Sequence, residues 1–221
     1  MSKSHYRKKD RKCIKNNIKR RPSSRNAYEK IFIVVEGHSE EKYFNTLKRH
    51  WKLHTVVVEN PDCTDPINLL DKALKLLEES NPNKNTMLEP PFDEVWIVYD
   101  LEQPNNERRK LSKDAKNRAK QKSNIHFAIS DPSFEFWYIL HYETTTKSFT
   151  DANNVEQYLK RYWKNYTKNS EPTLEIVEKT TVAIKNAQWL RKQLESNYAE
   201  APMTDVDQLV VKLTVFSSKN Q

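Results

Sequence analysis

Four short apolar runs, separated by stretches with a helical repeat, organise the first 140 residues. The runs are rich in β-branched and aromatic side chains, which favours buried strands; they cover residues 31–35, 55–59, 94–99 and 125–129. Between the first two runs, apolar side chains recur at helical spacing, as at Tyr43, Phe44 and Leu47. Alternation of strand and helix predicts an α/β fold, with about four parallel strands joined by right-handed crossovers and flanked by helices.

The helices between these strands have start signals of their own. The first is expected to open at His38 or Ser39, and the second at Asp65-Pro66, where an N-cap residue precedes proline at the first helical position. Two more are expected over residues 104–122, with few apolar anchors, and over 132–141, with many aromatic side chains. We interpret these aromatic side chains as core, because large rings supply burial first; they are Phe134, Phe136, Trp137 and Tyr138.

The pattern changes after residue 142. Long helical stretches are expected over 151–166 and 172–197 and a shorter one over 204–213, and no further strand is predicted. The sequence therefore divides into a basic arm (1–29), an α/β domain (30–145) and a helical C-terminal elaboration packed on the core (146–221).

Charge sets the arm apart from the body. Residues 1–30 hold twelve Lys/Arg against two acids, a net charge of +10, whereas the other 191 residues hold 26 basic and 28 acidic side chains, a net charge of −2. A cationic segment with few apolar residues is expected to be disordered alone and to attract polyanions such as DNA or RNA. The alternative is a solubilising tail.

Several classes of protein are excluded by composition. The chain has one glycine, so it cannot contain a G-x-G-x-x-G dinucleotide loop, a P-loop or a G-x-S-x-G elbow. Its two cysteines are far apart and lack zinc-ligand spacing, which suits a reducing compartment. No apolar run approaches the roughly 18 residues of a membrane span, and the basic N-terminus lacks the apolar stretch of a signal peptide. We expect a cytoplasmic protein with no membrane partner.

Acidic residues follow three of the four predicted strands. Glu36 ends the first, Asp100 and Glu102 end the third, and Asp131 and Glu135 follow the fourth. Ligands of open α/β sheets bind at this edge, and clustered carboxylates are stable mainly when a cation neutralises them. Hard oxygen ligands favour Mg²⁺ or Mn²⁺. Taken singly, each acid also suits a helix start or a turn.

The single glycine, Gly37, comes directly after Glu36. We interpret it as the turn from strand to helix, where the absence of Cβ allows positive φ and lets a phosphate or a metal-bound water approach the backbone. The alternative is a tight turn with no ligand.

Four segments, in order along the chain, carry a resemblance to known families. IFIVVEGHSEEKYF and VWIVYDLE look like the Toprim domain of topoisomerases, primases and OLD-type nucleases. SDPSFEFWYILHY and APMTDVDQLVVKL resemble segments of the RloB family, to which the abortive-infection protein AbiLii is similar; here Ala201 stands where that family's motif has Asn.

The resemblance implies a Toprim-like fold, metal-dependent hydrolysis of nucleic acid, a role in antiphage defence and a partner ATPase of the SMC/ABC type. It assigns Glu36 as general acid/base and Asp100 as a metal ligand. Glu102 takes the second acid position, where Toprim domains usually have Asp, and Glu135 falls in the Phe-Glu-x-Trp segment. A non-catalytic nucleic-acid-binding or sensor subunit is the alternative.

Basic residues follow the acid pair closely. Against Glu107 and Asp114, eight cations give this segment a charge of +6; they are Arg108, Arg109, Lys110, Lys113, Lys116, Arg118, Lys120 and Lys122. A helix that begins beside the acidic edge could hold a phosphate backbone there, and the alternative is a solvated helix face. His38 and His141 are possible neighbours of the site, although a lone histidine more often has a surface or core role.

Overall fold

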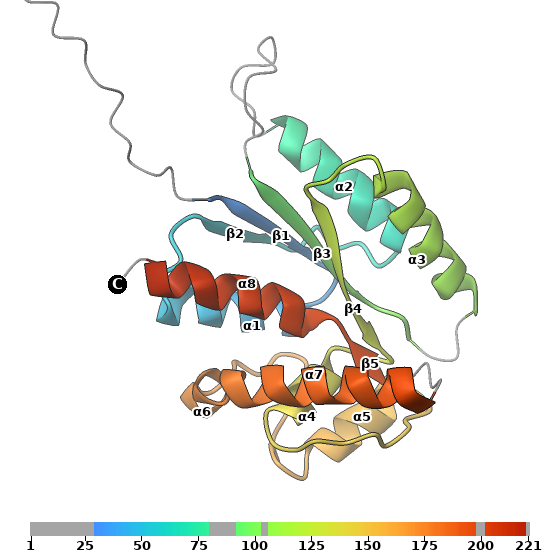
Figure 1. Ribbon diagram of the computed structural model, residues 1–221, viewed down its shortest axis with the longest axis vertical. Coiled ribbons are helices and arrows are strands. Elements are labelled where there is room, and N and C mark those ends of the chain that lie inside the picture. Colours follow the sequence, from blue (N-terminus) through green and yellow to red (C-terminus); the bar gives the residue numbers. More distant parts are fainter. Residues whose placement is uncertain (1–28, 80–91, 103–105, 198–201, 220–221) are drawn as a thin grey trace, which may run out of the picture.

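A computed structural model describes residues 29–79, 92–102, 106–197 and 202–219. The described chain forms a mixed α/β fold around a five-stranded sheet with the order β2-β1-β3-β4-β5 (Figure 1). The strands are β1 (Ile31–Val35), β2 (Val56–Glu59), β3 (Glu94–Asp100), β4 (Ile125–Asp131) and β5 (Met203–Thr204). The first four are parallel, and β5 runs antiparallel to β4.

The four predicted strands are all present, whereas the prediction of no further strand was wrong. β5 has two residues and pairs only with the end of β4, through Ser130–Thr204 and Asp131–Met203. A strand this short has no periodicity of its own, so only the tertiary contact defines it. The basic arm, apart from its last residue, lies outside the described residues.

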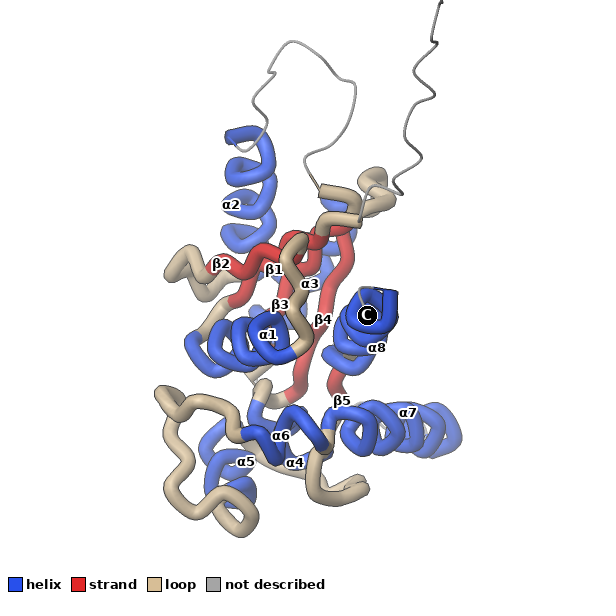
Figure 2. The backbone as a smooth tube through the Cα atoms, turned by 90° about the vertical axis from the view of Figure 1, so that its left-hand side faces the viewer, coloured by secondary structure: helices blue, strands red, loops and turns tan. Residues whose placement is uncertain are grey.

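Helices cover both faces of the sheet. β1 is buried throughout, and its alternate side chains enter two different cores. Ile31, Ile33 and Val35 pack with α1 (His38–His50) and α8 (Val206–Lys219), and the side chains between them pack with α2 (Pro66–Glu79) and α3 (Asn106–Ala119). Figures 1 and 2 show these two pairs of helices on opposite sides of the sheet.

The remaining helices gather beyond the carboxyl ends of β3 and β4 (Figures 1 and 2). They are α4 (Glu135–Leu140), α5 (Ala152–Leu159), α6 (Leu174–Glu178) and α7 (Thr180–Asn197). The single helix predicted over 172–197 is two helices, which meet at Lys179. A β-branched run begins at Thr180, whose hydroxyl donates to the Ile176 carbonyl, and both features disfavour an uninterrupted helix. The helix predicted over 151–166 ends at Leu159.

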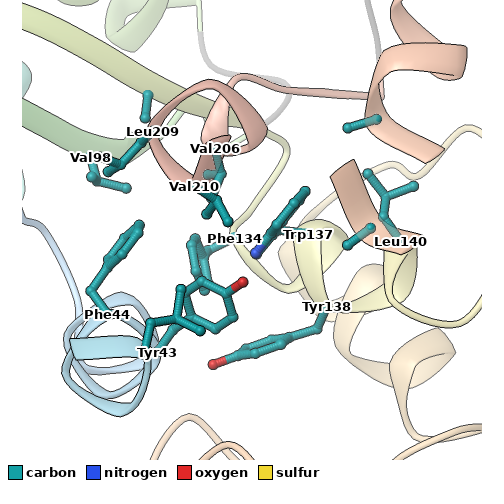
Figure 3. Packing of buried hydrophobic residues seen from close by; sticks show 14 of the residues in the cluster. Tyr43, Phe44, Val98, Phe134, Trp137, Tyr138, Leu140, Val206, Leu209 and Val210 are labelled. Carbon is teal, nitrogen blue, oxygen red and sulfur yellow. The ribbon is translucent and has the colours of Figure 1, made fainter. Parts of the chain in front are cut away.

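Aromatic side chains fill the core between α1, α4 and α8 (Figure 3). Tyr43 lies edge-on to Phe134, Trp137 and Tyr138, with ring centroids 5.6, 6.2 and 5.7 Å away. The prediction that the aromatic residues of 134–138 belong to the core is therefore confirmed, since all four are at most 1% exposed. His141 is buried with them and contacts the Trp137 carbonyl through Nδ1 at 2.9 Å.

Candidate functional site

The order of the strands places a switch point between β1 and β3. From β1 the chain passes through α1 to β2 at one side, and from β2 it crosses to β3 at the other side of β1. The connections after these two strands run to opposite faces of the sheet, and the carboxyl ends beside such a switch point are where open α/β sheets bind ligands. Glu36 follows β1, and Asp100 is the last residue of β3.

Backbone contacts hold these two acids together. The Glu36 backbone N–H donates to the Val98 carbonyl at 3.0 Å, which extends the β1–β3 ladder by one residue. The Asp100 backbone N–H in turn donates to the Glu36 carboxylate at 3.2 Å. The sequence-based expectation that strand ends bring Glu36 and Asp100 to one edge is met by this geometry.

Gly37 makes room for a third acid. It is the N-cap of α1, with φ −128° and ψ 171°, so the prediction of a positive φ was wrong and its backbone is extended. A Cβ on Gly37 would instead lie 2.8 Å from Oε2 of Glu40. The Glu40 carboxylate therefore folds back over the start of α1 and is buried there, at 4% exposure.

Glu135, in the first turn of α4, is the fourth acid and is 2% exposed. Its Oε1 accepts hydrogen bonds from the Ser39 hydroxyl at 3.1 Å and the Tyr166 hydroxyl at 2.7 Å. Ser39 comes from α1 and Tyr166 from the segment after α5, and their hydroxyls lie 3.0 Å apart. The Glu135 carboxylate of α4 is thus held in place from α1 and from the segment after α5. The four acids Glu36, Glu40, Asp100 and Glu135 are called the acidic cluster below.

Burial and mutual repulsion raise the pKa values of three members of the cluster, Glu36, Glu40 and Asp100. Burial, followed by the charges of Glu135 and Glu36, raises the pKa of Glu40 to about 8. The pKa of Asp100 is also raised well above its usual range, first by burial and then by the other three carboxylates. Burial raises the pKa of Glu36 as well, against the opposing effect of Arg108.

The cluster fits a divalent cation by its chemistry. Its ligands are hard carboxylate oxygens, and the buried Oδ1 of Asp100 has no hydrogen-bond partner among the described residues. A cation would remove the repulsion that raises these pKa values. Within the described part of the chain, however, no three His, Cys, Asp or Glu side chains already stand in a metal-binding arrangement. Side chains would therefore have to adjust to bind the ion.

Arg108 neutralises part of the cluster. Its guanidinium donates to the Glu36 carboxylate and to the carbonyls of Asp100 and Thr64, and the residue is 7% exposed. The sequence placed Arg108 among cations that face a phosphate backbone, but the structure buries it behind the acids. Glu102 stands at the rim instead, with a 54% exposed side chain, a positive φ of 51° and a distance of 3.9 Å to Arg108 Nε.

The other cations of α3 differ in their surroundings. Arg109 pairs with the buried Asp131, and Arg118 pairs with Asp71 on α2. Three lysines are exposed along the helix: Lys110, Lys113 and Lys116. His38 is exposed and contacts Glu41 and Asn60.

The sequence analysis missed Glu40, Ser39 and Tyr166. A signal for Glu40 exists, because it lies three or four residues before Tyr43 and Phe44 and hence on the buried side of α1. The same spacing applies to Ser39, four residues before Tyr43, whereas Tyr166 carries no comparable signal, since 127 residues separate it from Ser39.

Fold and site together define a mixed α/β protein with buried carboxylates at the switch point of a mostly parallel sheet. Compared with known protein families, residues 31–213 match the family described as RloB-like protein. The chain therefore belongs to the RloB-like family, as the sequence resemblance predicted. No curated protein and no solved structure matches it. Of the helices described, none is long and apolar enough to cross a bilayer.

Proposed function

We propose that this chain is a metal-dependent nuclease with a Toprim-like fold. The observation that carries the proposal is a group of four acidic side chains at the ligand-binding edge of the sheet, one directly after β1 and the others in α1, β3 and α4. The pKa values of three of them, Glu36, Glu40 and Asp100, are raised, first of all by burial. Buried carboxylates that repel one another destabilise a fold in their charged form, and a bound cation would remove that repulsion. We therefore expect this group of carboxylates to bind a cation and not to serve only the stability of the fold.

The proposed roles follow from where each side chain lies. Glu40, Asp100 and Glu135 would hold Mg²⁺ or Mn²⁺, and Ser39 and Tyr166 would keep Glu135 oriented. When bound, the metal would polarise a phosphodiester and lower the pKa of a water molecule. Glu36, whose pKa is raised, would take or return a proton at its carboxylate. Glu102, at the exposed rim, would reach the metal only by turning inwards.

The substrate and partners in the proposal come from family membership and charge. Exposed lysines on α3 begin near the acidic edge and suit contact with DNA or RNA phosphates. The RloB-like match, together with the resemblance of the four segments, supports a role in antiphage defence or abortive infection with an SMC/ABC-type ATPase as partner.

One observation favours the alternative of a non-catalytic nucleic-acid-binding or sensor subunit. Arg108 already supplies a cation to Glu36, and no preformed metal-binding group is present among the residues described. In that case the pair Arg108–Glu36 would be a permanent structural contact, and divalent ions would change neither stability nor activity.

Cleavage assays distinguish the two functions. Labelled tRNA, single-stranded DNA and duplex DNA would be incubated with Mg²⁺ or Mn²⁺ and either wild-type protein or Glu36→Gln, which keeps the shape of the side chain. Cleavage by the wild type that the variant loses by about a hundredfold or more supports the nuclease. Equal rates with the two proteins would refute the role of Glu36, and binding without cleavage of any substrate would favour the alternative.

A further inference from the structure

A pocket of about 500 Å³ opens on the other side of β4 from the acidic cluster. It lies where α3, α7 and β5 meet, and it is called the β5 pocket below. Leu190 and Leu194 of α7 and Met203 of β5 give it an apolar wall. Its charged groups are two arginines and two acids: Arg109, Arg191, Glu195 and Asp205. A volume of this order suits one small organic group.

Each of the two arginines pairs with a buried aspartate and keeps part of its side chain exposed to the pocket. Arg191 donates to both carboxylate oxygens of Asp207, at 2.6 and 3.2 Å, and the Asp207 side chain is 2% exposed. Arg109 donates to one carboxylate oxygen, Oδ2, of the buried Asp131. The arginine side chains nevertheless remain 35% and 30% exposed. A guanidinium that is already fixed in place loses little entropy when its remaining donors bind a ligand.

A single row of residues connects the pocket with the cluster. Asp100 pairs with Ser130 across β3 and β4, and Ser130 pairs with Thr204 across β4 and β5. Thr204 lines the pocket, and its hydroxyl lies 3.1 Å from that of Ser130. Two strand spacings of about 4.8 Å separate Asp100 from Thr204, a distance of about 10 Å. Neighbouring nucleotides of one strand could therefore reach both places.

We infer that the β5 pocket binds the nucleotide next to the phosphodiester held at the acidic cluster. This inference rests on the proposed nuclease function. An apolar wall suits the face of a base, and anchored guanidinium groups suit its phosphate. The Asp205 carboxylate, which accepts from Gln208 at 3.2 Å and lies 3.8 Å from Arg191, would keep its remaining lone pairs for the amino groups at the edge of the base. The pocket would therefore admit a base that is out of the duplex stack and select for an unpaired or frayed strand.

Binding of mononucleotides tests the pocket without any need for cleavage. The metal-free protein would be titrated with 5′-AMP, 5′-CMP, 5′-GMP, 5′-UMP and inorganic phosphate while the methyl signal of Met203 is followed by NMR. We expect a saturable shift with at least one nucleotide, and binding of phosphate at least about tenfold weaker, a difference of about 1.4 kcal/mol. No shift with any nucleotide, or equal affinity for phosphate, would overturn the inference.

Variants locate the bound nucleotide. Leu194→Trp fills the pocket and should weaken nucleotide binding at least about tenfold, a loss of about 1.4 kcal/mol. Val182→Trp adds a similar bulk to the same helix at a 44% exposed site outside the pocket, and it should bind like the wild type. Arg109→Gln removes a donor without changing the wall and should also weaken binding, so the test does not depend on one variant folding. Nucleotide affinity that survives in both pocket variants would overturn the inference.

The same titration on Glu36→Ala separates this inference from the proposed function. Nucleotide binding that persists in this variant, and in a wild type that cleaves nothing, would support the pocket while the nuclease proposal fails. If the wild type cleaves nucleic acid but binds none of the nucleotides, the nuclease proposal would be supported and the inference about the β5 pocket would be overturned.

Discussion

Gly37 and Glu40 are complementary in shape, because a Cβ on the glycine would lie 2.8 Å from the Glu40 carboxylate oxygen. The glycine has an extended backbone, so its conformation alone would allow any residue. The space that it leaves is occupied by a buried carboxylate of the acidic cluster. The single glycine of this chain therefore serves the site through its missing side chain.

Gly37→Ala tests this relationship. Since φ is negative, alanine should be tolerated and should change the free energy of unfolding by no more than about 1 kcal/mol in either direction. The displaced Glu40 carboxylate should weaken Mn²⁺ binding about tenfold or more, as measured by calorimetry. His38→Ala, at the neighbouring exposed position, is the control and should bind like the wild type. Unchanged affinity in Gly37→Ala would contradict a role for this space in metal binding.

Tyr166→Phe removes one hydrogen bond to Glu135 and leaves the ring in place. We expect a loss of about 1 kcal/mol in stability and about tenfold in Mn²⁺ affinity, because the carboxylate is less firmly oriented. The matched control is Tyr162→Phe. The Tyr162 hydroxyl donates to the Glu143 carboxylate at a distance of 2.6 Å, and this contact is not part of the acidic cluster. If both variants lost metal affinity equally, the contact with Glu135 would not be the cause.

The acidic cluster predicts an unusual dependence of stability on pH. The folded-state pKa of Glu40, about 8, is raised above the ordinary value of 4.5. Its protonated form thus contributes stability that is full below about pH 4.5 and is lost as the pH rises through 8. Thermal unfolding of the metal-free protein between pH 5 and 9 should show stability falling with rising pH.

Glu40→Gln is the comparison for this pH dependence. The uncharged amide cannot titrate, so the decline between pH 5 and 9 should shrink by at least about 1.4 kcal/mol, the free energy of one pKa unit. Added Mg²⁺ should likewise reduce the decline in the wild type by neutralising the carboxylates. A wild-type stability that rises steadily over this range would refute the raised pKa values.

Arg108→Gln leaves the Glu36 carboxylate buried without its cation. Removal of one partner from a buried pair costs about 3–5 kcal/mol, and urea denaturation should measure a loss of that size at neutral pH. Part of this loss should return with Mg²⁺ if a metal can take the place of the guanidinium. Arg118→Gln is the control, because the exposed pair Arg118–Asp71 should contribute no more than about 1 kcal/mol. If Arg108→Gln lost no more stability than Arg118→Gln, the buried Glu36 carboxylate would not need this arginine as its counter-charge.

Exposed lysines of α3 should contribute to binding of nucleic acid through charge alone. Lys113→Ala should weaken binding of a labelled oligonucleotide and reduce the slope of log affinity against log salt by about 0.7–0.9. Lys75→Ala, at an exposed lysine of α2, is the control. Identical slopes for the two variants would place the bound strand away from α3.

Much of the sheet could be predicted because each parallel strand is an apolar run buried on both sides. β5 could not be predicted, because it has two residues and is defined only by its pairing with the end of β4. The rule that strand ends meet at one edge was enough to pair Glu36 with Asp100. The position of Arg108 was predicted wrongly, because a segment with a charge of +6 has the pattern of an exposed helix face. The burial of that arginine depends on a carboxylate 72 residues away.

The route of the chain also sets when the acidic cluster can form. Glu36 is made before both of the residues that complete the site: Tyr166, which orients Glu135, comes after α5, and Thr204, which contacts the end of β4, comes after α7. During synthesis the first three strands and their helices emerge before either of these contacts exists. A nascent chain would thus carry the acids without the residues that position them, so any activity of the site would begin only after Tyr166 and Thr204 have emerged and packed against the sheet.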